Sequence, residues 1–133
     1  MIAPFHVGID LVQVSRIAES LECFGERFLR RIFTEDEIAY ACAEPTRTAE
    51  RLAARFAAKE ATIKALRLAG HPINWRDIEV RRAITGDCAM ELHGALSELA
   101  ASEGHRQLAV SMSHEGDYAT AVVIASGPSI KDL

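Results

Sequence analysis

The longest helical pattern in the chain runs from Arg47 to Ala69, a stretch that contains neither glycine nor proline. It is rich in alanine, leucine, arginine, lysine and glutamate, which all favour helices. With Leu52 set at zero and a turn of 100° per residue, Phe56 and Ile63 fall within about 40° of it. The pattern therefore predicts one long helix with a single buried stripe, ending at Gly70.

Charged residues lie in and beside this stripe. Lys59 falls inside it, while Glu60 and Lys64 fall at about 80° and about 120°, along one margin. A Glu60–Lys64 pair at i,i+4 on an exposed helix is worth only about 0.2–0.5 kcal/mol. The same two groups at the edge of a core can instead line a site. Taken alone, this spacing favours an exposed pair.

The rest of the chain predicts short elements around this helix. Thr34 and Glu37 form a capping-box pattern, and Ser15 can cap the helix that follows it. Gly86-Asp87 marks a hairpin turn. We expect strands over residues 5–14, 75–81, 88–93, 107–113 and 118–125, and helices over 16–24, 26–32, 35–43 and 94–102. This order favours an α+β fold with helices against an antiparallel sheet, and neither GxGxxG nor a P-loop is present.

The first strand carries a carboxylate. Val7, Ile9 and Leu11 alternate onto one face, and Asp10 lies on the opposite face. A carboxylate inside a strand needs a partner, which makes Asp10 a candidate ligand or ion-pair member. The alternative is that Asp10 lies at a strand end, in water.

A third group lies near the end of the chain, in the segment Ser111 to His114. Ser111 and Ser113 share one face of the predicted strand, and Met112 and His114 share the other. Taken with Asp10 on the strand and with Lys59, Glu60 and Lys64 on the helix, the inventory is two carboxylates, two lysines, two hydroxyls and a histidine. Mg²⁺ prefers one or two carboxylates plus substrate phosphates, so this set suits phosphate transfer.

Length and composition limit the alternatives. A chain of 133 residues suits one domain, which we expect over residues 1–126 with a frayed tail over 127–133. The net charge of -4 argues against nucleic-acid binding. No segment has the pattern of a signal peptide or a membrane span, so no membrane association is expected. Three widely spaced cysteines suit a reducing compartment, and we expect the cytoplasm.

Six segments, taken together in this order, resemble the holo-[acyl-carrier-protein] synthase family: GIDLVQVSRI, FTEDEIAY, RLAARFAAKEATIKAL, WRDIEV, ELHGALSELA and VSMSHEGDYATAVVIA. The resemblance covers nearly the whole chain. It implies the 4'-phosphopantetheinyl transferase fold and a Mg²⁺-dependent transfer of 4'-phosphopantetheine from coenzyme A to a serine of apo acyl carrier protein. Adenosine 3',5'-bisphosphate is the other product.

The resemblance also implies roles for single residues. Asp10 and Glu60 match the two Mg²⁺ ligands, and Lys64 matches the lysine that holds the coenzyme A pyrophosphate. The other matches are Arg55 and Lys59 at coenzyme A phosphates, Ser113 and His114 lining the same site, and Arg16 at the carrier-protein contact. Relatives of this length are homotrimers with sites between subunits. Carriers of fatty acid biosynthesis and of secondary metabolism both fit the sequence.

Two segments depart from the family pattern. The glycine-rich loop usual after the long helix is replaced by RLAGHPINW, and a Gly-Lys-Pro turn is replaced by Gly86-Asp87-Cys88. These changes leave open a degenerate relative that binds carrier protein without catalysis. A nuclease is a weaker alternative, because the Glu60–Lys64 spacing is Glu-x-x-x-Lys and the chain is acidic.

Overall fold

The computed structural model describes residues 5–102 and 107–127. In chain order the elements are β1 (Phe5–Gln13), α1 (Val14–Phe24), α2 (Glu26–Ile32), α3 (Glu35–Cys42), η1 (Pro45–Arg47), α4 (Thr48–Ala65), η2 (Trp75–Asp77), β2 (Ile78–Arg82), β3 (Cys88–Leu92), α5 (Gly94–Ser102), β4 (Leu108–Glu115) and β5 (Tyr118–Ser126). The predicted α+β class is confirmed. Most of the predicted tail lies outside the described residues.

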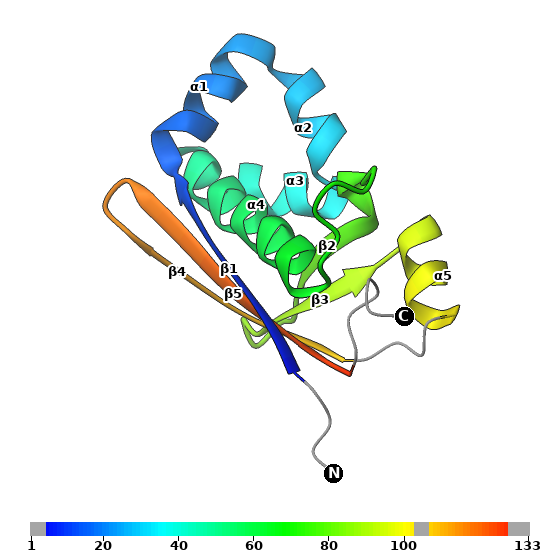
Figure 1. Cartoon of the computed structure of the whole chain (residues 1–133). Coiled ribbons are helices and arrows are strands. Elements are labelled where there is room, and N and C mark those ends of the chain that lie inside the picture. Colours follow the sequence, from blue (N-terminus) through cyan, green and yellow to red (C-terminus); the bar gives the residue numbers. More distant parts are fainter. Residues whose placement is uncertain (1–4, 103–106, 128–133) are drawn as a thin grey trace.

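Helix α4 is the centre of the molecule (Figure 1). It packs along one face of a three-stranded antiparallel sheet with strand order β1-β5-β4. Strands β2 and β3 form a separate two-stranded hairpin, so the single sheet expected from the sequence is in fact two. Alternation along a strand predicts its faces but not its neighbours, which is why the sequence pattern missed this division.

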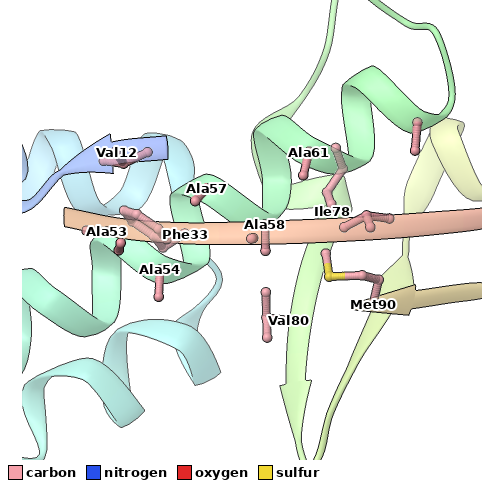
Figure 2. Close-up of a cluster of buried hydrophobic side chains, with 14 of the residues drawn as sticks. Val12, Phe33, Ala53, Ala54, Ala57, Ala58, Ala61, Ile78, Val80 and Met90 are labelled. Atoms are coloured by element: carbon pink, nitrogen blue, oxygen red, sulfur yellow. The ribbon is translucent and has the colours of Figure 1, made fainter. Parts of the chain in front are cut away.

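The buried face of α4 is wider than the predicted stripe. Leu52 is fully buried, but Phe56 and Ile63 are only half-buried. The deepest positions on the sheet side are alanines, and Figure 2 shows them beside the core side chains of the sheet and the β2–β3 hairpin. Small side chains let the helix and sheet backbones approach closely, so alanine carries much of this core.

Helix α4 ends earlier than predicted, at Ala65. The backbone N–H of Arg67 donates to Lys64 at 3.1 Å and that of Leu68 donates to Ile63 at 2.9 Å, which is the Schellman pattern. Arg67 takes the left-handed conformation (φ 56°) that usually falls to glycine, in the loop where the family pattern has glycines. Leu68 is buried, and this burial favours the early turn.

Other element boundaries also shifted. Residues Trp75–Asp77 form a 3-10 turn, so β2 begins only at Ile78. The last hairpin continues through His114, and its turn is Gly116-Asp117. Ser15 does not cap α1, because the helix begins at Val14, and its hydroxyl donates to Asp117 at 2.6 Å. No helix among the described residues is long and apolar enough to span a membrane.

Strand β1 lies directly against the backbone of α4 at Gly8. A Cβ added there would lie 2.0 Å from the carbonyl oxygen of Ala61 and 2.8 Å from the amide nitrogen of Ala65. Both are backbone atoms, so the clash cannot be relieved by a side-chain rotation. We expect Gly8→Ala to lower the free energy of unfolding by about 3 kcal/mol, measured by urea denaturation. A matched Gly116→Ala change has no atom within 4 Å of the added Cβ, although its φ of 56° adds some strain. Equal loss in both variants would contradict close contact at Gly8.

Candidate active site

The first candidate site lies between β1 and α4. The Lys64 ammonium is 3.1 Å from an Asp10 carboxylate oxygen and donates to the carbonyl of Ile9 at 2.9 Å. Glu60 lines the same pocket as Asp10, and Arg16 lies along it from α1. The structure therefore brings together four of the residues predicted from the sequence.

The exposed Glu60–Lys64 pair favoured by spacing does not form, since Lys64 instead pairs with Asp10 across 54 positions of the chain. Asp10 lies within the paired part of β1, opposite Ala121, and its side chain is 18% exposed. The strand-end alternative for Asp10 is therefore excluded. The carboxylate has the partner that its position requires.

Glu60 is held in an unfavourable environment for a negative charge. Burial raises the pKa of Glu60, the nearby Asp10 carboxylate raises it further, and the Lys64 ammonium partly opposes both. Two carboxylates converging in a half-buried pocket are stabilised by a cation. A hard divalent cation that takes carboxylate oxygens suits this pair, so the donor set fits Mg²⁺.

Lys59 lies elsewhere. Its side chain is fully buried, and its ammonium is 2.8 Å from the Glu37 carboxylate. It also donates to the carbonyls of Trp75, at 3.1 Å, and Ile78. An ammonium has three donors, and all three are used within the protein. This placement departs from the phosphate contact predicted for Lys59, because no donor remains for a ligand.

The second candidate site is a pocket of about 350 Å³ on the other side of α4, lined by Arg55, Ser113 and His114 among others. Arg55 is 5% exposed, and burial lowers the pKa of its guanidinium. His114 Nδ1 lies 3.5 Å from a Glu50 carboxylate oxygen. Asp87, the acid that departs from the family pattern, lines this pocket as well.

The two pockets are separated on one chain. Arg55 and Glu60 are five residues apart on α4, which places them about 140° apart around the helix. Their linings share no residue. A single copy therefore holds the predicted metal ligands and the predicted phosphate-binding residues on different faces.

Three residues of the second pocket were missed from the sequence: Tyr40, Arg51 and Arg82. Arg51 and Arg55 carried a weak signal, because like charges at i,i+4 on one helix face destabilise the helix unless another group compensates them. Nothing in the sequence placed Tyr40 of α3 or Arg82 of β2 beside them. That neighbourhood depends on how α3 and the hairpin pack on α4.

A further ionisable group lies on the β2–β3 hairpin, outside both pockets. Ligand atoms of Glu79, Glu91 and His93 lie within 4.8 Å of one another. Burial alone would raise the pKa of Glu79, but hydrogen bonds from Thr34 and His93, together with the positive charges of Arg81 and His93, outweigh it and lower that pKa. Arg81 pairs with Glu91 at 2.6 Å and lies 3.9 Å from Glu79, so this cluster already has its counter-charge.

The chain matches the family model of the 4'-phosphopantetheinyl transferase superfamily over residues 6–123. The chain belongs to this superfamily. Its relatives include the holo-[acyl-carrier-protein] synthases of Koribacter versatilis, 46% identical over 118 residues (88% of this chain and 94% of the relative), and of Herpetosiphon aurantiacus, 42% identical over 127 residues (90% and 97%).

Solved structures show the same transferase fold. The ACPS–CoA complex of Chronobacterium ammoniagenes matches with a TM-score of 0.82 at 36% identity, covering 94% of this chain and 98% of that chain. The holo-[acyl-carrier-protein] synthase of Helicobacter pylori in complex with coenzyme A matches with a TM-score of 0.77 at 29% identity, covering 90% and 99%. The expected family and fold are thereby confirmed.

Proposed function

We propose that this protein is a holo-[acyl-carrier-protein] synthase that transfers 4'-phosphopantetheine from coenzyme A to a serine of apo acyl carrier protein. The observation that carries the proposal is that Asp10 and Glu60 line one pocket of a superfamily member, with the Lys64 ammonium 3.1 Å from Asp10. The family match over residues 6–123 supports one transferase domain over residues 1–126. Relatives that bear the synthase name support the reaction.

The proposed reaction depends on Mg²⁺ held by Asp10 and Glu60. When bound, the ion supplies positive charge that neutralises and orients the pyrophosphate. Lys64, whose ammonium is half exposed beside Asp10, is placed to stabilise negative charge on the leaving phosphate. Both carboxylates must be ionised to bind a cation, so Mg²⁺ affinity should weaken as the pH falls through the raised pKa of Glu60.

Coenzyme A phosphates are assigned to the second pocket. Arg55 supplies a buried positive charge there, and Ser113 and His114 line the wall formed by β4. Lys59 has no part in this contact, since its three donors are already used. Arg16, exposed on α1 beside the Asp10 pocket, is assigned to the carrier protein. The carrier assignment implies lipid metabolism, including fatty acid biosynthesis, and a cytoplasmic location.

We further propose a homotrimer with sites between subunits. Strand β1 is an edge of its sheet, and it exposes a row of apolar side chains, from 60% to 66% each: Phe5, Val7, Ile9 and Leu11. Such a row on an unpaired edge calls for a covering partner. Association of copies can also bring the first pocket of one chain near the second pocket of another, which a single chain does not achieve.

This proposal predicts that Val7→Asp dissociates the trimer and lowers transfer at least tenfold, because a carboxylate would be buried without a partner. Val7 is chosen because its side chain points away from the Asp10 face. Sedimentation velocity measures the oligomeric state. The matched control is Phe24→Asp, which changes a 62% exposed apolar residue on α1 and should leave the mass unchanged. A wild-type protein that sediments as a monomer would refute the proposal.

The activity is tested by incubating the protein with Mg²⁺, coenzyme A and an apo carrier protein, followed by mass spectrometry of the carrier. The expected result is a carrier heavier by one phosphopantetheine group, and none when the Mg²⁺ is chelated. Carriers from fatty acid biosynthesis and from secondary metabolism are assayed in parallel. Carrier binding without any gain in carrier mass would support the alternative, a degenerate relative that binds carrier protein without catalysis.

A further inference from the structure

The second pocket contains an aromatic ring surrounded by arginines. The guanidinium carbons of Arg51 and Arg55 each lie 4.2 Å from the centre of the Tyr40 ring, and that of Arg82 lies 5.2 Å from it. The arginines come from α4 and β2, and Tyr40 comes from α3. Three elements distant in the chain therefore meet at one ring.

These guanidiniums are not equally neutralised. Arg51 donates to the carbonyl of Tyr40 at 2.8 Å and pairs with Glu44 at 3.1 Å. Neither Arg55 nor Arg82 has a carboxylate within 4.0 Å in the described part of the chain. Burial lowers the pKa of Arg55, which reflects the cost of holding its charge there. Two positive charges thus line the pocket without a carboxylate in direct contact among the described residues, although Glu50 and Asp87 also line it.

The Tyr40 ring can hold such charges in place. An aromatic face carries partial negative charge, and a guanidinium within about 6 Å of its centre is attracted to it. Without the ring, like charges at i,i+4 and across to β2 would repel one another and separate toward solvent. The ring therefore fixes the arginines before any anion binds, and a preorganised site loses less entropy on binding.

We propose that Tyr40 is a positioning residue that orders Arg55 and Arg82 to receive phosphate groups of coenzyme A. The inference rests on the proposed function and gives a role to Tyr40, which lies in the segment FTEDEIAY but to which the sequence analysis assigned no function. The ring acts through its π face and not through its hydroxyl, for which no hydrogen bond exists among the described residues. Tyr40 does not itself contact the reacting atoms.

The test compares Tyr40→Phe, which keeps the face, with Tyr40→Leu, which removes it. For Tyr40→Leu we expect the Kd of coenzyme A by calorimetry, and its KM, to rise roughly tenfold. The kcat and the KM for carrier protein should stay within twofold. Tyr40→Phe should restore coenzyme A binding to within twofold of wild type. Unchanged binding in Tyr40→Leu, or equal loss in both variants, would overturn the inference.

A second measurement covers the case in which Tyr40→Leu does not fold. Phenylalanines with increasing ring fluorination can be incorporated at position 40. They keep the shape of the ring but progressively reduce the partial negative charge on its face. We expect the Kd of coenzyme A to rise stepwise along the series, and a flat series would overturn the inference. A separate result would refute the proposed function: wild-type protein that modifies no carrier protein. Wild-type protein that binds no coenzyme A would overturn both.

Discussion

Glu60→Gln is expected to lower phosphopantetheine transfer by at least about 10³-fold, equivalent to about 4 kcal/mol of lost transition-state stabilisation. Glutamine keeps the size of the side chain and one oxygen but removes the charge that binds Mg²⁺. The remaining activity should no longer respond to Mg²⁺ concentration. The measurement is the initial rate of carrier modification by mass spectrometry, across a Mg²⁺ titration. Near-normal transfer would show that Glu60 is not a metal ligand.

The same variant should not be less stable. The pKa of Glu60 is raised in the folded protein, so the folded state binds this proton more tightly than the unfolded chain does. The free energy of unfolding therefore falls as the pH rises through the raised pKa of Glu60. An uncharged glutamine does not ionise, so the variant does not lose this stability. We expect a Tm at neutral pH equal to or above that of wild type. A lower Tm would point to misfolding as the cause of lost activity.

Two controls make the result specific. Mg²⁺ should raise the Tm of wild type, because ligand binding to the folded state stabilises it, and should leave the Tm of Glu60→Gln unchanged. Glu98→Gln, an exposed change on α5 outside both pockets, should keep wild-type transfer. Loss of activity in Glu98→Gln would indicate a general effect of charge.

Lys59→Met is expected to lower the free energy of unfolding by about 3–5 kcal/mol, because it leaves the Glu37 carboxylate buried without its counter-charge. Both side chains of this pair are fully buried, and Glu37 also accepts from the backbone amides of Thr34 and Val80. The measurement is urea denaturation at neutral pH. A loss below about 1 kcal/mol would contradict the buried pair.

The double variant Lys59→Met with Glu37→Gln isolates the interaction. Glutamine retains the capping-box acceptor but carries no charge, so we expect the double variant to be more stable than the sum of the single changes by at least about 1.5 kcal/mol. In folded Lys59→Met protein the KM for coenzyme A should stay within twofold of wild type. A larger rise in this KM would indicate that Lys59 does contact a phosphate of coenzyme A, as the family resemblance implied.

Local patterns in the sequence predicted much of the fold. Both hydrogen bonds of the capping box between Thr34 and Glu37 are present. Helices α2 and α5 have the predicted bounds. These features depend on neighbouring residues, so the chain encodes them within a few positions. The early end of α4 was missed because Arg67 takes a conformation that sequence rules assign to glycine, and burial of Leu68 favours the turn there.

The candidate site divides in the same way. Helical periodicity placed Lys59 inside the core stripe and Glu60 at its edge, and the structure agrees with both placements. The partners could not be predicted. Spacing alone favoured a pair between Lys64 and Glu60 four residues away, yet Lys64 pairs with Asp10 on β1. Pairing across a sheet–helix contact depends on register and packing, which no local spacing specifies.

The family, the long helix and the charged residues along it can be identified from the amino-acid sequence alone. The role of each charge depends on how the surrounding elements pack against the helix. Lys59 and Glu60 are adjacent in the chain, but one lies fully buried against Glu37 and the other lines an open pocket with Asp10. The physical reason is that neighbouring residues on a helix point about 100° apart, so the packing of surrounding elements decides which of them is buried.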